Sequence, residues 1–281
     1  MFMLRQESHK IIHFDKGVCS MKKLISVLLA AAALLSLCSC SGKSIKFGDD
    51  ITQTTEAIPG LPSVETTQDK REFKDESGRT VCLVTGEIPQ LSGGAGYPTD
   101  KINSALKLMF VHKSDEAKNN IKNAAEFMDS QSSDQPWSTK LTYELKYMDE
   151  SIVSFLCNIY FSYFGPDTLV PSHTAVGVCV DMKTGEILNL LSFAGDEKDA
   201  ARQQLIEIVQ KKSATGFYAG NTLTKEQLQL IADTFDENNF WYKDGVFSYF
   251  FDRATIAQND SGYYVCELKP SDYSGILSLE R

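Results

Sequence analysis

The order of hydrophobic and polar residues after residue 73 alternates between the period of a helix and the period of a strand. In the segment INSALKLMF, residues 102–110, apolar side chains fall at i, i+3, i+4, i+7 and i+8, which makes one stripe of an amphipathic helix. The same kind of stripe indicates three further helices, each packed through one face, at 117–128, 201–209 and 228–235.

Strand periodicity occupies most of the remaining folded part. Residues 153–163 carry a wholly apolar face opposite Ser154, Asn158 and Ser162, and Asn238–Phe251 is predicted to be a hairpin. Short links between the strands favour an antiparallel meander, and strands and helices come in blocks. The predicted class is therefore α+β, with antiparallel sheets and helices packed on one face. Further strands are predicted at 80–89, 141–147, 176–182, 187–190 and 263–268.

The first forty residues contain the pattern of an export signal. The run MKKLISVLLAAAALLSLCSC begins at Met21 with two lysines, continues with an apolar stretch to Leu37 and ends in cysteines. The stretch has the length of a signal h-region, about 7–15 residues, and is short for a membrane span of about 20. As in a bacterial lipobox, Cys40 follows the small Ser39, whereas the alternative acceptor Cys38 follows the bulky Leu37.

Cys40 is therefore the predicted lipidation site, where a diacylglyceryl group and palmitate would anchor the chain in the cell membrane, facing the outside. An ordinary cleaved signal and a membrane anchor helix are the alternatives. Residues 41–72, rich in Thr, Ser, Gly and Pro, are predicted to be a disordered tether. The complete expected organisation is a mis-assigned start (1–20), a lipoprotein signal peptide (21–40), the tether (41–72), and two intimately joined α+β subdomains (73–164 and 165–281).

Charge narrows the classes of partner. The chain has 28 basic and 37 acidic residues, of which residues 1–39 hold five and two, so the exported part has 23 and 35, a net charge of −12. Nucleic acid is not an expected partner, because its phosphates are bound by Lys and Arg. A cationic partner would be attracted, although such a charge also serves solubility alone.

The cysteines leave two states open. Cys82, Cys157, Cys179 and Cys266 all lie in apolar, strand-like runs, and none belongs to a CxxC pair, so a structural zinc site is not expected. Disulfides are permitted outside the membrane, whereas buried free thiols are common in such runs. If one disulfide forms, Cys157–Cys179 is the favoured pair.

Motifs for catalysis are not evident. The exported part has two histidines, His112 and His173, without the context of a zinc site, which needs about three protein ligands. Ser172 precedes His173 but belongs to no GxSxG elbow, and the KTG at 183–185 lacks a matching SxxK and indicates a turn. We therefore expect a protein that is not an enzyme, with no cofactor, no metal and no catalytic residue.

Aromatic residues beside predicted loops are the candidate binding groups. Tyr160, Tyr163 and Phe164 precede a loop at Gly165–His173, and another pair, Trp241 and Tyr242, lies at the predicted hairpin. Aromatic side chains at such places often anchor partners, and the alternative is that they fill the core. The predicted partner-binding residues are Tyr163, Phe164, Asp167 and His173.

Two stretches resemble a tandem of extracellular domains of unknown function. The first, 73–164, has a strand ending in Ile88-Pro89, a helix containing Ile102-Asn103, and paired strands. The second, 165–276, contains VCVDMKTGEILNL and FFD before Ile256-Ala257. This arrangement is similar to the tandem of the anti-sigma-V factor and of the N-terminal part of a peptidoglycan deacetylase. Where that family has Gly-Gly-Ala-His, this chain reads GPDTLVPSH and retains only His173.

The resemblance implies a partner as well as a fold. In the anti-sigma-V factor these domains bind lysozyme from outside, so a lysozyme-like cationic protein or a cell-wall glycan such as peptidoglycan is the implied partner. Signalling to a sigma factor is not expected, because the apolar segment ends at a lipobox. The expected function is a non-enzymatic cell-envelope lipoprotein. The alternative is a cell-wall-modifying hydrolase or deacetylase, or an accessory subunit of one.

Overall fold

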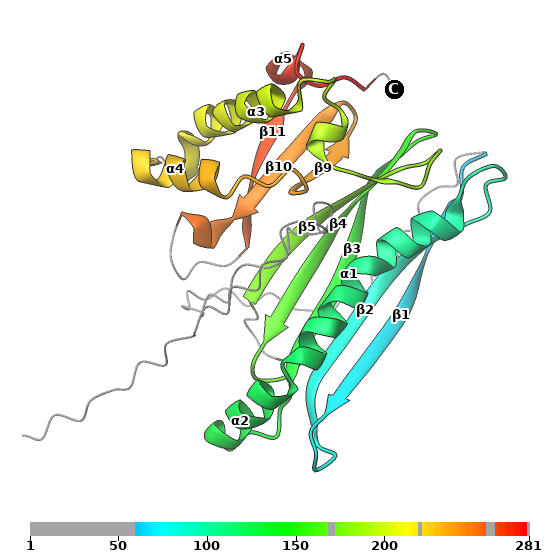
Figure 1. The fold of residues 1–281 in the computed structure, drawn as a ribbon, viewed down its shortest axis with the longest axis vertical. Helices are drawn as coiled ribbons and strands as arrows, with labels where there is room; N and C mark the ends of the chain where they lie inside the picture. Colours follow the sequence, from blue (N-terminus) through cyan, green and yellow to red (C-terminus); the bar gives the residue numbers. More distant parts are fainter. Residues whose placement is uncertain (1–59, 168–171, 219–220, 257–261, 280–281) are drawn as a thin grey trace, which may run out of the picture.

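The computed structural model describes residues 60–167, 172–218, 221–256 and 262–279. Cys40, the export signal and residues 41–59 of the expected tether lie outside these residues. No helix within the described ranges is long and apolar enough to cross a membrane. The class is α+β, as predicted, and it is built from a curled six-stranded sheet, a smaller three-stranded sheet and five helices (Figure 1).

The larger sheet has its strands in chain order, and all its pairs are antiparallel except β2 with β3. That pair is parallel because two consecutive helices, α1 and α2, cross the sheet between the strands and return the chain in the same direction. The strands are β1 (Ser63–Lys74), β2 (Thr80–Ser92), β3 (Trp137–Met148), β4 (Ile152–Ser162), β5 (Ser172–Asp181) and β6 (Ile187–Leu188), and the helices are α1 (Thr99–Asn119) and α2 (Ile121–Gln131).

The remaining elements form a second unit beside β4 and β5 (Figure 1). Its three-stranded sheet has the order β11-β10-β9, and the turn between β9 and β10 uses Asp244 and Gly245 at φ 48° and 80°, as a tight hairpin requires. Its elements are η1 (Leu190–Ser192), α3 (Lys198–Ser213), β7 (Thr215–Tyr218), β8 (Asn221–Thr222), α4 (Lys225–Asp233), β9 (Phe240–Lys243), β10 (Val246–Asp252), η2 (Arg253–Thr255), β11 (Tyr263–Leu268) and α5 (Pro270–Tyr273).

The expected tether needs a correction. Residues 63–72 belong to β1, which pairs with β2 from Ser63↔Ser92 to Phe73↔Cys82. The segment is polar because β1 is an edge strand with mostly exposed residues, and its backbone hydrogen bonds to β2 order it without a large apolar face. An ion pair of 2.9 Å between Asp69 and Lys107 of α1 adds a contact with the helix layer.

The two faces of the large sheet are covered by different units. On one face, Ile102, Leu106 and Phe110 of α1 pack on apolar residues of β2, β3 and β4. On the other face, the second unit covers the end of β4 and β5, which buries Ser154 and makes its hydroxyl the acceptor for the backbone N–H of Tyr242 at 2.9 Å. Strand β4 is therefore buried on both faces. Strands β5 and β6 lie beyond residue 165 and still belong to this sheet.

All four cysteines of the described residues are buried and free. The pair favoured from the sequence is wrong, because Cys157 faces the core beneath α1 whereas Cys179 lies in the core of the second unit. Burial raises the pKa of Cys157 to about 12, so it stays a thiol at neutral pH.

Candidate functional site

Aromatic rings from α2, β3 and β4 meet at one end of the large sheet, and we call this cluster the aromatic patch. Tyr163 lies at its centre, with ring centroids 4.7 Å from Phe161, 4.9 Å from Trp137 and 5.3 Å from Phe127. Phe164 lies 5.6 Å from Phe127. Most of these rings meet edge to face, the arrangement that aromatic quadrupoles prefer. The patch comprises Phe127, Trp137, Phe161, Tyr163 and Phe164.

The local backbone explains why the last two rings project here. Strand β4 ends at Ser162, whose hydroxyl accepts a hydrogen bond from the backbone N–H of Phe164 at 3.0 Å. Gly165 then adopts a φ of 89°, and a side chain there would meet Gln135, with its Cβ 2.5 Å from the Oε1 atom. A glycine is therefore required for the chain to turn away directly after Phe164.

Phe164 is the part of the patch most open to a partner. Its exposed fraction is 54%, the highest of any large hydrophobic residue in the described ranges. Phe127 and Tyr163 are half-buried beneath and beside it, and burial raises the pKa of Tyr163. An exposed ring on a packed aromatic base is a rigid contact surface, because little side-chain entropy remains to be lost on binding.

Acidic residues border this patch. Asp134 and Asp167 are exposed and lie next to the contact between Gln135 and Gly165. On α2, Glu126 and Asp129 are close to Phe127 in sequence, but their side chains, 67% and 68% exposed, line a separate cleft. The rim of the patch therefore presents carboxylates.

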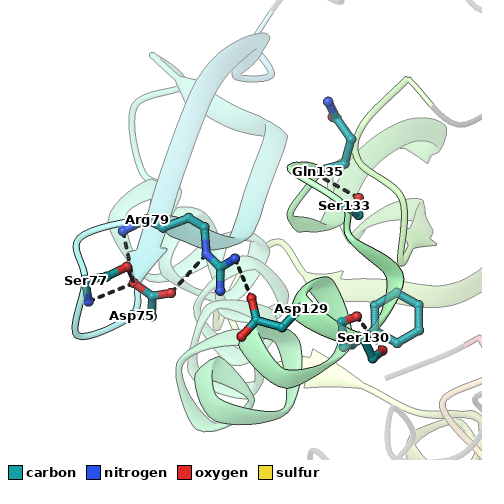
Figure 2. A network of polar contacts seen from close by, with 8 residues as sticks. Asp75, Ser77, Arg79, Asp129, Ser130, Ser133 and Gln135 are labelled. Atoms are coloured by element: carbon teal, nitrogen blue, oxygen red, sulfur yellow. Dashed lines mark hydrogen bonds and ion pairs between the residues drawn. The ribbon is translucent and has the colours of Figure 1, made fainter.

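A polar cleft of about 600 Å³ lies on the other side of α2. Arg79 bridges its two sides: its Nε donates to Asp75 at 3.1 Å and its Nη1 donates to Asp129 at 2.7 Å (Figure 2). These bonds join the β1–β2 turn to the helix that carries Phe127. The cleft is lined by Asp75, Glu76, Ser77, Arg79, Ile121, Lys122, Ala125, Glu126 and Asp129.

The predicted site residues fall into two places. Tyr163 and Phe164 belong to the patch, and Asp167 follows them as an exposed residue. His173 does not join them, because it pairs with Tyr160 on the opposite face of the sheet, where the two rings stack at 4.5 Å. From the sequence these residues were grouped because Tyr163 and Phe164 directly precede the predicted loop that ends at His173, but strand alternation turns His173 to the opposite face.

His173 instead ends a hydrogen-bonded chain across three strands. Its Nε2 lies 3.1 Å from Oδ1 of Asn158, and Nδ2 of Asn158 donates to Glu144 at 2.9 Å. The amide nitrogen of Asn158 faces the carboxylate, so its amide oxygen faces His173 and accepts a hydrogen bond from Nε2–H. In this neutral tautomer Nδ1 carries no hydrogen and can only accept. Burial lowers the pKa of His173, and Glu144 opposes this shift.

The other residues singled out in the sequence contribute to packing, surface contacts or turns. Tyr242 is buried, whereas Trp241 is half-buried and stacks on Phe250 at 5.5 Å. His112 contacts Glu116 on the surface of α1 at 3.1 Å, and the KTG at 183–185 is a turn, as predicted. Within the described ranges, no group of three or more His, Cys, Asp or Glu residues is placed to hold a metal ion.

Sequence reasoning missed part of the patch. Phe127 and Trp137 lie 36 and 26 positions before Tyr163 and join it only through the docking of α2 and the pairing of β3 with β4. The only signal in the sequence was local: Trp137 follows a proline and begins an alternating strand.

Comparisons with known proteins find similarity in part of the chain. Residues 76–165 match the family model described as Deacetylase PdaC, and this segment contains the whole aromatic patch but neither His173 nor Trp241. No curated protein matches the chain.

Two solved structures are similar to it. One, a member of the DUF3298 family (BF2082) from Bacteroides fragilis, has 12% identity and a TM-score of 0.49, and the match covers 77% of this chain and 94% of that one. The other, a DUF3298 family protein (PA4972) from Pseudomonas aeruginosa, has 14% identity, a TM-score of 0.47, and coverage of 78% and 95%. The family match therefore shows a similarity to Deacetylase PdaC that is limited to residues 76–165.

Proposed function

We propose that this protein is an exported, non-enzymatic lipoprotein that binds a cationic protein of the lysozyme type at the cell surface. The observation that carries the proposal is Phe164, a 54% exposed ring on a packed aromatic base. Aromatic residues of this kind are common anchors in protein interfaces. The bordering carboxylates, Asp134 and Asp167, would favour a basic partner and speed its approach.

Binding of lysozyme by the soluble chain 41–281 tests this proposal. We expect saturable binding that persists at physiological salt and is weakened about tenfold or more by Phe164→Ala, the loss typical of an interface anchor. The matched control is Leu230→Ala, which removes another exposed apolar side chain, 45% exposed, on the distant helix α4. Binding that vanishes at physiological salt, or that Phe164→Ala leaves unchanged, would reject the patch as the site.

The lipid anchor is a separate part of the proposal. If Cys40 carries the lipid, Cys40→Ala abolishes palmitate incorporation and releases the protein from the membrane fraction, whereas Cys38→Ala does neither. Labelling that depends on Cys38 instead would move the acceptor, and labelling of neither cysteine would argue for an ordinary cleaved signal.

A second candidate function rests on the family match. Residues 76–165 are similar to a family named for a deacetylase, which favours a cell-wall-modifying enzyme or its accessory subunit as the alternative. Incubation of the soluble chain with peptidoglycan separates the two: released acetate or glycan fragments would establish the enzyme, and their absence with retained lysozyme binding would favour the binding protein.

A further inference from the structure

A second cluster of aromatic rings and polar groups, its rings half-buried, lies on the face of the large sheet opposite the aromatic patch, where the two sheets meet. We call it the seam surface. Strands β3, β4 and β5 contribute from the large sheet, and β9 and β11 contribute from the smaller one. Its residues are Glu144, Lys146, Tyr160, His173, Trp241 and Tyr263, all of them half-buried or exposed.

The way the sheets pack leaves this surface at the border of their contact. Gly177 of β5 lies directly beneath β9, and a Cβ there would be 1.7 Å from the backbone oxygen of Phe240. Leu156 and Phe250 fill the interior next to it. The seam surface begins where this apolar contact ends, so its rings have one side on the core and one side toward solvent.

A buried network fixes the orientation of the polar groups. Asn158, only 3% exposed, uses both ends of its amide, donating to Glu144 at 2.9 Å and accepting from His173 at 3.1 Å. Burying an amide costs free energy unless both its N–H and its C=O groups are hydrogen-bonded, whereas an apolar residue at this position would fill the space without that cost. What this amide adds is a fixed position for the Glu144 carboxylate and for the His173 ring, as a preformed site requires.

The rings form a continuous wall beside that carboxylate. Tyr160 stacks on His173 at 4.5 Å, His173 meets the edge of Tyr263 at 5.5 Å, and Tyr263 lies 6.4 Å from Trp241. Burial raises the pKa of both Tyr160 and Tyr263, and the charge of the Glu144 carboxylate raises it further. Two tyrosine rings and a carboxylate held by Asn158 therefore lie on this face beside an indole ring.

Charge pairing on this face points to the class of ligand. Lys146 forms an ion pair with Glu144 and lies 5.0 Å from the centre of the Trp241 ring, and on the adjacent part of the face Lys140 pairs with Glu87 at 3.7 Å. The charges are balanced within the protein, so neither a cationic protein nor a polyanion is favoured here. Oriented hydrogen-bonding groups beside aromatic rings suit an uncharged ligand that carries hydroxyl groups.

We propose that the seam surface binds an uncharged, hydroxyl-rich ring of the saccharide class, with Glu144 and the hydroxyls of Tyr160 and Tyr263 as hydrogen-bonding groups and Trp241 as the adjoining apolar wall. This site is separate from the aromatic patch and does not depend on the function proposed for it.

Calorimetric titration of the soluble chain 41–281 with the hexamers of glucose and of N-acetylglucosamine tests the proposal. We expect one or both to bind with a millimolar or lower Kd. Tyr263→Phe keeps the ring and removes only the hydroxyl group, and it should weaken binding about tenfold, the effect of losing one well-placed hydrogen bond. Trp241→Ala should weaken it at least as much. The matched control is Tyr97→Phe, which removes a hydroxyl on the opposite face, beside α1.

Each result bears on the proposal. Binding of either hexamer that is weakened by Tyr263→Phe and unchanged by Tyr97→Phe and Phe164→Ala would support it, and a preference for the acetylated hexamer would assign an acetamido-bearing sugar. Absence of binding at millimolar concentrations of both hexamers would overturn it, as would binding that Tyr263→Phe and Trp241→Ala leave unchanged while the circular dichroism spectra match the unsubstituted chain.

Discussion

At the scale of single residues, His173 is a histidine whose charge the fold disfavours. Its ring lies between Tyr160 and Tyr263, and its Nε2 faces Asn158, so burial lowers its pKa below the ordinary value of 6.5 despite the nearby Glu144. The unfolded chain then binds a proton more readily than the folded chain does. The resulting stabilisation is complete above the unfolded pKa and is lost as the pH falls through the folded pKa.

This predicts an acid-sensitive contribution that belongs to one residue. His173→Gln keeps a donor toward Asn158 but cannot be protonated, so its free energy of unfolding should fall less between about pH 7.5 and about pH 5 than that of the unsubstituted chain. Urea unfolding at both pH values measures the difference. An equal fall in the free energy of unfolding for the two chains would contradict this account of His173.

At the scale of elements, a single glycine lets the two sheets approach. Because the Cβ of residue 177 would lie 1.7 Å from the backbone oxygen of Phe240, Gly177→Ala forces β5 and β9 apart. Overpacking of a core typically costs about 1–3 kcal/mol, and here the obstructing atom belongs to the backbone and cannot rotate away. We expect a loss in the free energy of unfolding at or above this range.

Gly195→Ala is the matched control for that change, because nothing lies within 4 Å of its added Cβ. Its free energy of unfolding should change by no more than about 0.5 kcal/mol, as for other surface substitutions. Urea unfolding compares the two variants. A Gly177→Ala protein as stable as the Gly195→Ala protein would show that the contact between the sheets is looser than the structure indicates.

Local signals in the sequence predicted the elements better than their partners. The helix predicted at 228–235 is present at 225–233, where Thr224 and Gln227 form a capping box, and the hairpin predicted at Asn238–Phe251 is formed by β9 and β10. Strand β1 was missed because its order comes from β2 and not from its own polar sequence. The parallel pairing of β2 with β3 was missed because it depends on the path of α1 and α2.

The candidate site divides in the same way. Tyr163 and Phe164 were predicted because both precede a loop and both are aromatic. The rest of the patch depends on contacts between residues far apart in the sequence, as does the separation of His173 from it. The period of two shows which residues of β4 share a face, and likewise for β5. The register between the two strands, which pairs Tyr160 with His173, cannot be predicted from the sequence across a nine-residue loop.

At the scale of the whole molecule, the question is whether the matched segment 76–165 folds without the rest. It ends where the predicted first subdomain ends, after β4. In the complete chain, β4 pairs with β5 from Ile152↔Asp181 to Phe161↔Ser172, and its second face is covered by the smaller sheet. A chain that stops at residue 164 leaves this edge unpaired and this face open to water.

We therefore expect the fragment 60–164 to be insoluble or to unfold without a cooperative transition, whereas 60–281 unfolds in one transition that is the same by far-UV circular dichroism and by tryptophan fluorescence. The two tryptophans make the comparison informative, because Trp137 lies in the patch beside α2 and Trp241 lies in the smaller sheet. Coincident transitions mean that the two sheets unfold together, since the buried strand β4 belongs to both cores. A soluble, cooperatively folding 60–164 fragment would show instead that the matched segment is an independent domain.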